Sequence, residues 1–330
     1  MKTKTIRLKN RPVGVPKPGD FELVTQELPG LSQGEILLEA SYISVDPYLR
    51  GKMSGTKEPR FELGQPITSK LIARVVESRN PHFRSGDYVS DYLLWQEFQI
   101  AGGSGLTKID PHQAPLPAYL GVLGITGLSA YLPLLDYGQP KPGETLVVSG
   151  AAGAVGSIAG QIGKILGCRV VGIVGSEEKA ELVKEKFGFD QAVNYRGSND
   201  LNAAIASACP HGVDLYFDNV GGPISEAVIA NINPYGRIIV CGAISNYNET
   251  TPALSPSLLP LVVYKFLRIQ GFLIADFSSR FPQALNQLHE WLQQGKITYS
   301  ETIVQGFENL PNAFIGLFEG LNQGKMIVEI

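Results

Sequence analysis

The stretch VVSGAAGAVGS, residues 147–157, carries small residues at the spacing of a dinucleotide-binding turn. In the pattern G-x-G-x-x-G the first glycine makes the turn, the second lets the backbone approach a pyrophosphate, and the third lets the next helix pack closely. Gly153 and Gly156 hold the second and third positions, while Ala151 stands at the first, where it serves if the turn needs no positive φ. We interpret the stretch as a pyrophosphate-binding turn at a helix N-terminus; a tight turn without a nucleotide is the alternative.

The end of the next predicted strand favours NADP over NAD. An NAD site usually places an acidic residue there to bind the ribose 2′-hydroxyl. Here the strand ends in Gly175 and Ser176, which leave room for a 2′-phosphate, and Lys179 follows as a cation with Tyr195 as a phenol donor. Glu177 and Glu178 oppose an anion unless they point away, and Lys179 could otherwise be an ordinary solvated helix charge.

The sequence contains no recognisable motif of metal-ligating or nucleophilic residues. The three cysteines (Cys168, Cys209, Cys241) are widely spaced, and the four histidines (His82, His112, His211, His289) are scattered. The sequence has no C-x2-C cluster and no H-E pair, and VSGAAG lacks the G-x-S-x-G elbow of hydrolases. We therefore expect hydride chemistry without zinc.

Two kinds of element must position these residues. Residues 1–120 predict strands separated by turn residues, at 34–45, 70–78 and 86–101, and clear helical periodicity is hard to find there. From about residue 125 to 295, apolar strands alternate with helices, with strands at 169–175, 213–221, 236–245 and 268–274. The last residues predict a strand, a helix near 309–320 and the strand GKMIVEI, which can return to the first domain.

The fold class predicted from these elements is α/β, with a Rossmann-type doubly wound parallel sheet domain and a β-rich domain. Gly156, Gly160, Gly163 and Gly167 follow on one helix face and predict close packing of that helix on the sheet.

Composition limits the partners. The net charge of -3 gives no basic field for nucleic acid or an anionic membrane, and no apolar run approaches 18 residues. Three cysteines do not indicate a disulfide framework, and the first residues show no apolar leader, so a cytoplasmic location is expected. The apolar strand RIQGFLI resembles a strand that pairs across a sheet edge, which predicts a homodimer.

Several motifs together resemble one family, the zinc-free medium-chain dehydrogenase/reductases. They are GDYVS (86–90), LGITGLSAY (123–131), AAGAVGS (151–157), GSEEK (175–179), FDNVGG (217–222) and CGAIS (241–245). VDPYLRG (45–51) and QGFENLPNAF (305–314) resemble the branch of prostaglandin and leukotriene B4 reductases, alkenal double-bond reductases and curcumin reductases. Thr126 replaces a proline common in that branch, and Asn246 stands where threonine is common.

This resemblance implies a domain division and a set of site residues. Residues 1–122 and 300–330 would form a GroES-like barrel domain, and 123–299 the Rossmann NADP-binding domain. The cofactor NADP(H) would contact Ala152, Gly153, Ala154, Val155, Gly156, Lys179, Tyr195, Asn219, Cys241, Gly242, Ala243, Ile244, Ser245, Asn246, Tyr247, Phe272, Leu273, Ile274 and Asn322.

The implied activity is NADPH-dependent reduction of a carbon–carbon double bond conjugated to a carbonyl. Hydride attack at the β-carbon places negative charge on the carbonyl oxygen, and Tyr247 and Tyr48 are the candidate hydrogen-bond donors to it. Either tyrosine could instead be a wall residue. A quinone reductase of the same superfamily and a non-catalytic nucleotide-binding protein are the alternatives.

Overall fold

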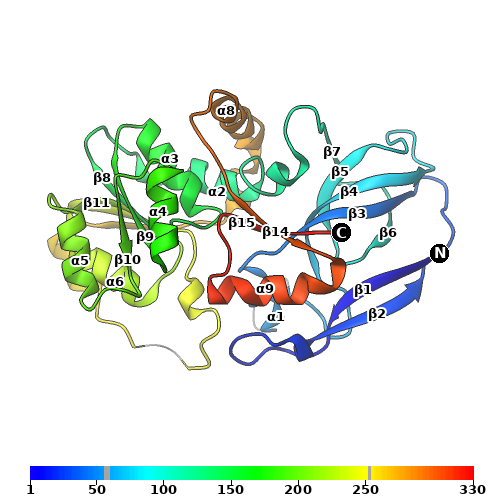
Figure 1. Cartoon of the computed structure of the whole chain (residues 1–330), viewed down its shortest axis with the longest axis horizontal. Helices are drawn as coiled ribbons and strands as arrows, with labels where there is room; N and C mark the ends of the chain where they lie inside the picture. The colour runs from blue at the N-terminus through cyan, green and yellow to red at the C-terminus, as the bar shows by residue number, and fades with distance from the viewer. Residues whose placement is uncertain (56–59, 252–253) are drawn as a thin grey trace. The chain divides into compact units, whose positions relative to one another are not determined.

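The computed structural model describes residues 1–55, 60–251 and 254–330, which form two compact units. Unit 1 contains Met1–Leu120, Glu301–Asn322 and Met326–Ile330, and unit 2 contains Gly121–Ser300 and Gln323–Lys325 (Figure 1). The short segment Gln323–Lys325, which the predicted division assigned to the first domain, thus belongs to unit 2.

Unit 2 is built on a six-stranded parallel sheet in the order β10-β9-β8-β11-β12-β13. Its strands are β8 (Thr145–Ser149), β9 (Arg169–Val174), β10 (Gln191–Asn194), β11 (Val213–Asp218), β12 (Ile232–Val240) and β13 (Arg268–Gly271). Every residue of β8 is buried, as expected for an apolar strand covered on both faces. Numbered by their place in the sequence, the strands have the order 3-2-1-4-5-6. Successive strands are added outward on one side of β8 and then on the other side from β11, and this change of direction in the sheet is the point at which such sheets bind nucleotides.

Helices connect these strands and cover the sheet. Unit 2 contains α2 (Ile125–Pro133), α3 (Gly156–Ile165), α4 (Glu177–Glu185), α5 (Leu201–Ala208), α6 (Gly222–Ala230), α7 (Leu259–Tyr264) and α8 (Phe281–Gln293), with the short turns η3 (Leu134–Gly138), η4 (Ile244–Asn246) and η5 (Ile274–Arg280). Glycines let α3 lie directly on the sheet: a Cβ at Gly160 would stand 1.9 Å from the Phe189 ring, and one at Gly163 2.4 Å from Leu146 Cδ2. The predicted glycine face is therefore confirmed at these two positions.

Unit 1 is a β-rich body around a core that includes the fully buried Trp95 and Phe314. Its larger sheet has the order β14-β15-β3-β4-β5-β7, with β6 beside β3, and β1 pairs with β2. The strands are β1 (Lys2–Leu8), β2 (Phe21–Glu27), β3 (Ile36–Ser44), β4 (Thr68–Ser78), β5 (Tyr88–Leu94), β6 (Phe98–Ala101), β7 (Thr107–Ile109), β14 (Glu301–Gln305) and β15 (Lys325–Glu329). Short helices are α1 (Leu49–Met53), α9 (Leu310–Glu319), η1 (Pro18–Asp20), η2 (Leu116–Leu120) and η6 (Phe307–Asn309).

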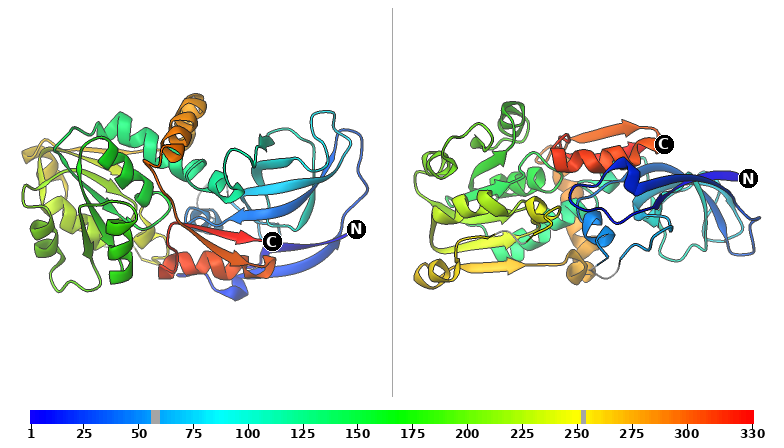
Figure 2. Two further views of the ribbon diagram at one scale, coloured as in Figure 1. Left: turned by 45° about the horizontal axis from the view of Figure 1, so that its top comes forward. Right: turned by 90° about the horizontal axis from the view of Figure 1, so that it is seen from below.

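The C-terminal strand β15 pairs antiparallel with β3, so the end of the chain joins the larger sheet of unit 1. Figure 2 shows this red strand beside the orange strand β14.

The predicted fold class is confirmed, since a parallel Rossmann-like sheet and a separate β-rich sheet are both present. Several predicted strands were wrong in their limits. The strand predicted over 86–101 is two strands, because Trp95 leaves the ladder and its N–H donates to the Ile67 carbonyl at 2.7 Å. The strand predicted at 236–245 ends at Val240, and the strand predicted at 268–274 ends at Gly271. The helix α1 was not predicted.

Candidate functional site

The glycine turn after β8 has the geometry that the sequence required of it. Gly150, with φ of 60°, makes the left-handed step, so Ala151 needs no positive φ and stays fully buried. The Gly153 N–H donates to the Gly150 carbonyl at 2.9 Å, and α3 begins at Gly156. A Cβ at Gly156 would lie 2.4 Å from that same carbonyl oxygen, so glycine is required for this close approach.

A distant segment supports the turn from outside. The Gly324 N–H donates to the Ala152 carbonyl at 2.7 Å, and Gly324 forms a parallel bridge with Gly153. Gly324 has φ of +70°, and a Cβ there would lie 1.8 Å from the Ser300 carbonyl oxygen. Sequence reasoning missed Gly324, because no local pattern connects it with a loop so far away in the chain.

The end of β9 presents cations beside small residues. Ser176 caps α4, since its hydroxyl accepts from the Lys179 N–H at 3.3 Å, and a Cβ at Gly175 would lie 3.3 Å from the Tyr195 hydroxyl oxygen. Burial lowers the pKa of Lys179, and the nearby positive charge of Arg196 lowers it further. The Arg196 guanidinium also lies 5.7 Å from the centre of the Tyr195 ring. Sequence reasoning missed Arg196, although its place next to Tyr195 was the available signal.

The two glutamates of α4 are occupied by amide donors. The Glu177 carboxylate accepts from Asn194 Nδ2 at 2.7 Å, and the Glu178 carboxylate accepts from Gln323 Nε2 at 2.5 Å. Glu178 raises the pKa of Lys179, but this effect is smaller than the combined lowering by burial and by Arg196. Two cations, a phenol and small residues therefore fit a phosphate monoester at the end of β9, where an acidic residue would have fitted a free ribose hydroxyl.

At the change of direction in the sheet, the ends of β8 and β11 are joined by side chains. Asn219 Nδ2 donates to the Ser149 carbonyl at 2.7 Å, and the Asn219 N–H donates to the Ser149 hydroxyl at 2.9 Å. The end of β12 joins them, since the Cys241 and Gly242 N–H groups donate to the Asp218 carbonyl at 2.8 and 3.1 Å. The structure thus brings the turn after β8, Asn219 and the 241–242 segment together.

Tyr247 closes the segment that follows β12. Its hydroxyl oxygen accepts from the Ala243 N–H at 3.3 Å, a bond that leaves the phenol proton for another acceptor. Burial, the leading cause, raises the pKa of Tyr247, and Cys241 and Asp218 raise it further. The group is therefore suited to donating a hydrogen bond while keeping its proton.

The other predicted residues lie elsewhere. Phe272, Leu273 and Ile274 follow β13; the Phe272 ring packs edge-on against Phe277, and Leu273 is exposed. Tyr48 and Asn322 belong to unit 1. Tyr48 directly precedes α1 with its ring partly exposed, and burial together with Asp46 and Tyr92 raises its pKa.

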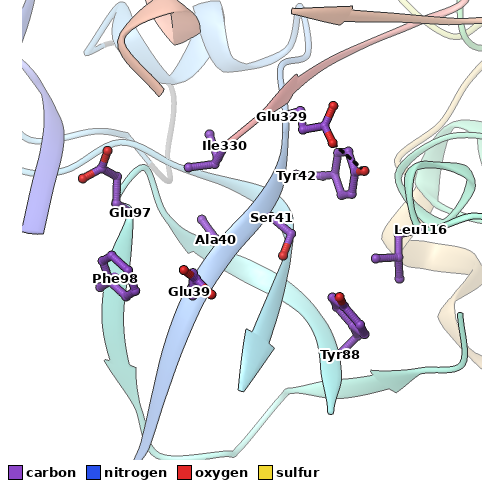
Figure 3. Close-up of a pocket in the computed structure, with 10 residues that line it drawn as sticks. All are labelled: Glu39, Ala40, Ser41, Tyr42, Tyr88, Glu97, Phe98, Leu116, Glu329 and Ile330. Atoms are coloured by element: carbon purple, nitrogen blue, oxygen red, sulfur yellow. Dashed lines mark hydrogen bonds between the residues drawn. The ribbon is translucent and has the colours of Figure 1, made fainter. Parts of the chain in front are cut away.

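A hollow of about 430 Å³ lies in unit 1, against β3 and β6 (Figure 3). It contains none of the predicted site residues. Its carboxylates are engaged: Glu329 accepts from Tyr42 at 2.9 Å and from Gln305 at 2.6 Å, and Glu39 pairs with Arg74. Burial and Glu329 raise the pKa of Tyr42 to about 12. Glu97 is engaged as well, since its carboxylate accepts from the Lys4 N–H and pairs with the Lys4 ammonium.

Within residues 1–55, 60–251 and 254–330, no three His, Cys, Asp or Glu side chains gather to hold a metal ion. Over the same ranges no helix is long and apolar enough to cross a membrane. Chemistry without zinc and a cytoplasmic location stay predictions.

A doubly wound parallel sheet with a glycine turn where the strand order reverses is the architecture of a dinucleotide-binding domain. Comparison with known proteins agrees. Residues 4–109 match a family described as the N-terminal domain of oxidoreductase, and residues 154–290 match one described as zinc-binding dehydrogenase.

Individual relatives match along the whole chain. Prostaglandin reductase 1 of Bos taurus is 47% identical and covers 99% of this chain and 98% of its own. The NADPH-dependent curcumin reductase of Escherichia coli is 42% identical, with coverages of 98% and 95%. The crystal structure of CurA from Vibrio vulnificus in complex with NADPH superposes with a TM-score of 0.94 at 42% identity, covering 99% of this chain and 98% of that one.

The chain therefore belongs to the medium-chain dehydrogenase/reductases, in the branch that contains the prostaglandin, alkenal and curcumin reductases. The predictions of this family, of an oxidoreductase and of NADP(H) as its cofactor are confirmed.

Proposed function

We propose that this protein reduces the carbon–carbon double bond of α,β-unsaturated aldehydes and ketones with NADPH. The observation that carries the proposal is the pairing of a glycine turn at the change of sheet direction with Lys179, Arg196 and Tyr195 at the end of β9. The relatives add the reaction class, since those compared reduce curcumin or prostaglandins by name. Medium-chain alkenals, 15-oxoprostaglandin-like enones and curcumin-like diarylenones are the proposed acceptors.

The cofactor, when bound, supplies a hydride to the β-carbon of the acceptor. Residues 152–156 would hold its pyrophosphate on the α3 N-terminus, and Lys179 with Tyr195 its 2′-phosphate. Asn219, the 241–247 segment, Phe272–Ile274 and Asn322 are the further proposed contacts. The Tyr247 phenol would donate a hydrogen bond to the carbonyl oxygen as it gains negative charge. Tyr48 stays the second donor candidate predicted from the sequence.

A panel of acceptors tests this function directly. The oxidation of NADPH is followed by its absorbance with a long alkenal, a cyclic enone and a diarylenone, each beside its saturated analogue. Turnover is expected with the unsaturated compounds alone, and mass spectrometry should show products heavier by two hydrogens. Oxidation of NADH but not NADPH would contradict the assignment of Lys179 and Tyr195.

Two other functions remain to be separated by the same panel. A quinone reductase would turn over a quinone and leave every alkenal unchanged. A non-catalytic nucleotide-binding protein would bind NADPH and reduce none of the acceptors.

We further propose that the protein is a homodimer formed through β13, the outermost strand of the unit 2 sheet. All four residues of β13 are exposed, among them the apolar Ile269. Large apolar side chains that precede the strand are exposed as well: Leu259, Val263, Tyr264 and Phe266. An unpaired strand edge flanked by apolar side chains suits pairing with the same strand of a second copy.

A further inference from the structure

Asp218 is a buried carboxylate next to Asn219 and the 241–242 segment, and neither the predictions from sequence nor the proposed mechanism gave it a role. It ends β11 at the change of sheet direction and is 5% exposed. Within the described ranges no lysine, arginine or histidine forms an ion pair with it. A buried charge without a counter-ion is costly, so its presence calls for an explanation.

Neutral donors surround the carboxylate. Its Oδ1 atom accepts from the Ser149 hydroxyl at 2.9 Å and from the Tyr216 hydroxyl at 2.8 Å. The same atom accepts from the backbone N–H groups of Val220 and Gly221 at 2.9 and 3.0 Å. Its Oδ2 atom accepts from the Ser225 hydroxyl. These donors stabilise an anion without neutralising it, so the charge acts on whatever lies beside it.

The field of this charge reaches the segment after β12. Asp218 raises the pKa of Tyr247, and burial together with Asp218 raises the pKa of Cys241 to about 12. A Cβ at Gly242 would lie 3.1 Å from the Tyr247 hydroxyl and 3.4 Å from the Asn219 carbonyl oxygen. The Cys241 and Gly242 N–H groups also donate to the Asp218 carbonyl at 2.8 and 3.1 Å, so the segment proposed to contact the cofactor is held directly against Asp218.

We propose that Asp218 sets the redox bias of this site: its negative charge, fixed by five neutral donors, stabilises the positive charge of the oxidised nicotinamide. The ring is neutral in NADPH and becomes a cation when two electrons and a hydrogen nucleus leave it for the β-carbon; a proton from water completes the product at the α-carbon. A fixed anion nearby therefore favours hydride donation over its reversal. This inference rests on the cofactor placement in the proposed function.

A simpler role for Asp218 would be to cap α6. Two of its donors, the N–H groups of Val220 and Gly221, lie at the start of that helix. A cap contributes to stability and would affect the binding of both cofactor forms equally, whereas a charge beside the ring would affect NADP+ and NADPH differently. The ratio of the dissociation constants of NADP+ and NADPH therefore distinguishes the two roles.

The test compares Asp218→Asn with Asp214→Asn in the full-length protein. Asparagine keeps an oxygen at the Oδ1 position and removes the charge. Asp214 is the matched control, a carboxylate at the opposite end of the same strand that accepts from the Thr145 N–H at 2.8 Å and from Asn233 at 2.7 Å. The dissociation constants of NADP+ and NADPH are measured by calorimetry, without any acceptor.

For D218N we expect the affinity for NADP+ to fall relative to NADPH by about fivefold or more, as for one unit charge acting across a protein interior. D214N should leave the ratio unchanged. Equal weakening of both forms in D218N would overturn the proposal in favour of the helix cap.

If D218N does not fold, the wild type provides the test. We expect it to bind NADP+ at least as tightly as NADPH, and a clear preference for NADPH overturns the proposal. Since no acceptor is used, an unchanged ratio leaves enone reduction standing, and a failed acceptor panel leaves this result standing.

Discussion

At the scale of single residues, the proposal assigns the choice between NADPH and NADH to Lys179. Its ammonium stands beside Arg196 at a strand end without an acidic residue. For Lys179→Gln we expect the dissociation constant of NADPH to rise about tenfold, because a charge-assisted bond to the 2′-phosphate is lost, and that of NADH to change little. Fluorescence titration with both cofactors measures this.

Lys184 supplies the control on the same helix. It lies in the last turn of α4 and is exposed. Lys184→Gln removes the same charge from α4 and should leave both dissociation constants unchanged. Equal weakening of NADPH and NADH in the Lys179 variant would argue against a 2′-phosphate contact.

Tyr247 gives a prediction about pH. Burial raises its pKa above the ordinary value of 10, so the phenol keeps its proton throughout the neutral and mildly alkaline range. Its donor capacity is lost only as the pH rises through this raised pKa, and kcat should therefore show no loss attributable to Tyr247 between about pH 6 and 9.

The variant Tyr247→Phe removes the donor and keeps the ring. We expect kcat to fall about tenfold, with the dissociation constant of NADPH unchanged within about threefold. A fall in NADPH affinity at constant kcat would instead mean that Tyr247 only covers the cofactor.

At the scale of elements, the packing of α3 on the sheet depends on Gly160. A Cβ there would stand 1.9 Å from the Phe189 ring, so Gly160→Ala forces the helix or the ring to move. We expect the free energy of unfolding to fall by about 1–3 kcal/mol, measured by urea denaturation. The double variant Gly160→Ala/Phe189→Leu should recover part of the loss. Gly30→Ala, whose Cβ would meet nothing within 4 Å, is the neutral control.

Local patterns made much of unit 2 predictable. The run of glycines in α3 and the apolar strand β8 are short-range signals, and they predicted both the helix packing and the turn. The limits of β12 were harder, because Pro234 and the positive φ of Tyr235 lie inside a strand that the structure nevertheless forms.

The contacts that complete the candidate site are long-range, and no local pattern reports them. Gln323 reaches Glu178 across 145 residues of sequence, and Ser149 reaches Asp218 across 69. From the sequence alone, Glu177 and Glu178 of α4 could have opposed a bound phosphate. In the structure their carboxylates accept hydrogen bonds from Asn194 and Gln323, which lie outside α4. Residue types and their spacing predicted the cofactor class, while its supporting contacts required the fold.

At the scale of the whole molecule, the prediction is that β13 joins two copies into one continuous sheet. The variant Val263→Asp/Ile269→Asp places charges on exposed apolar positions beside and on this edge, where burial in a dimer would be costly. Sedimentation should give about twice 35.7 kDa for the wild type and about 35.7 kDa for the variant. Leu23→Asp is the matched control, since Leu23 is an exposed apolar residue on β2 of unit 1, and it should leave the dimer intact. A wild type that sediments as a monomer, or a double variant that stays dimeric, would exclude pairing through β13. In the wild type and the control, the unfolding temperature should also increase as the protein concentration increases, because association stabilises the folded state by mass action.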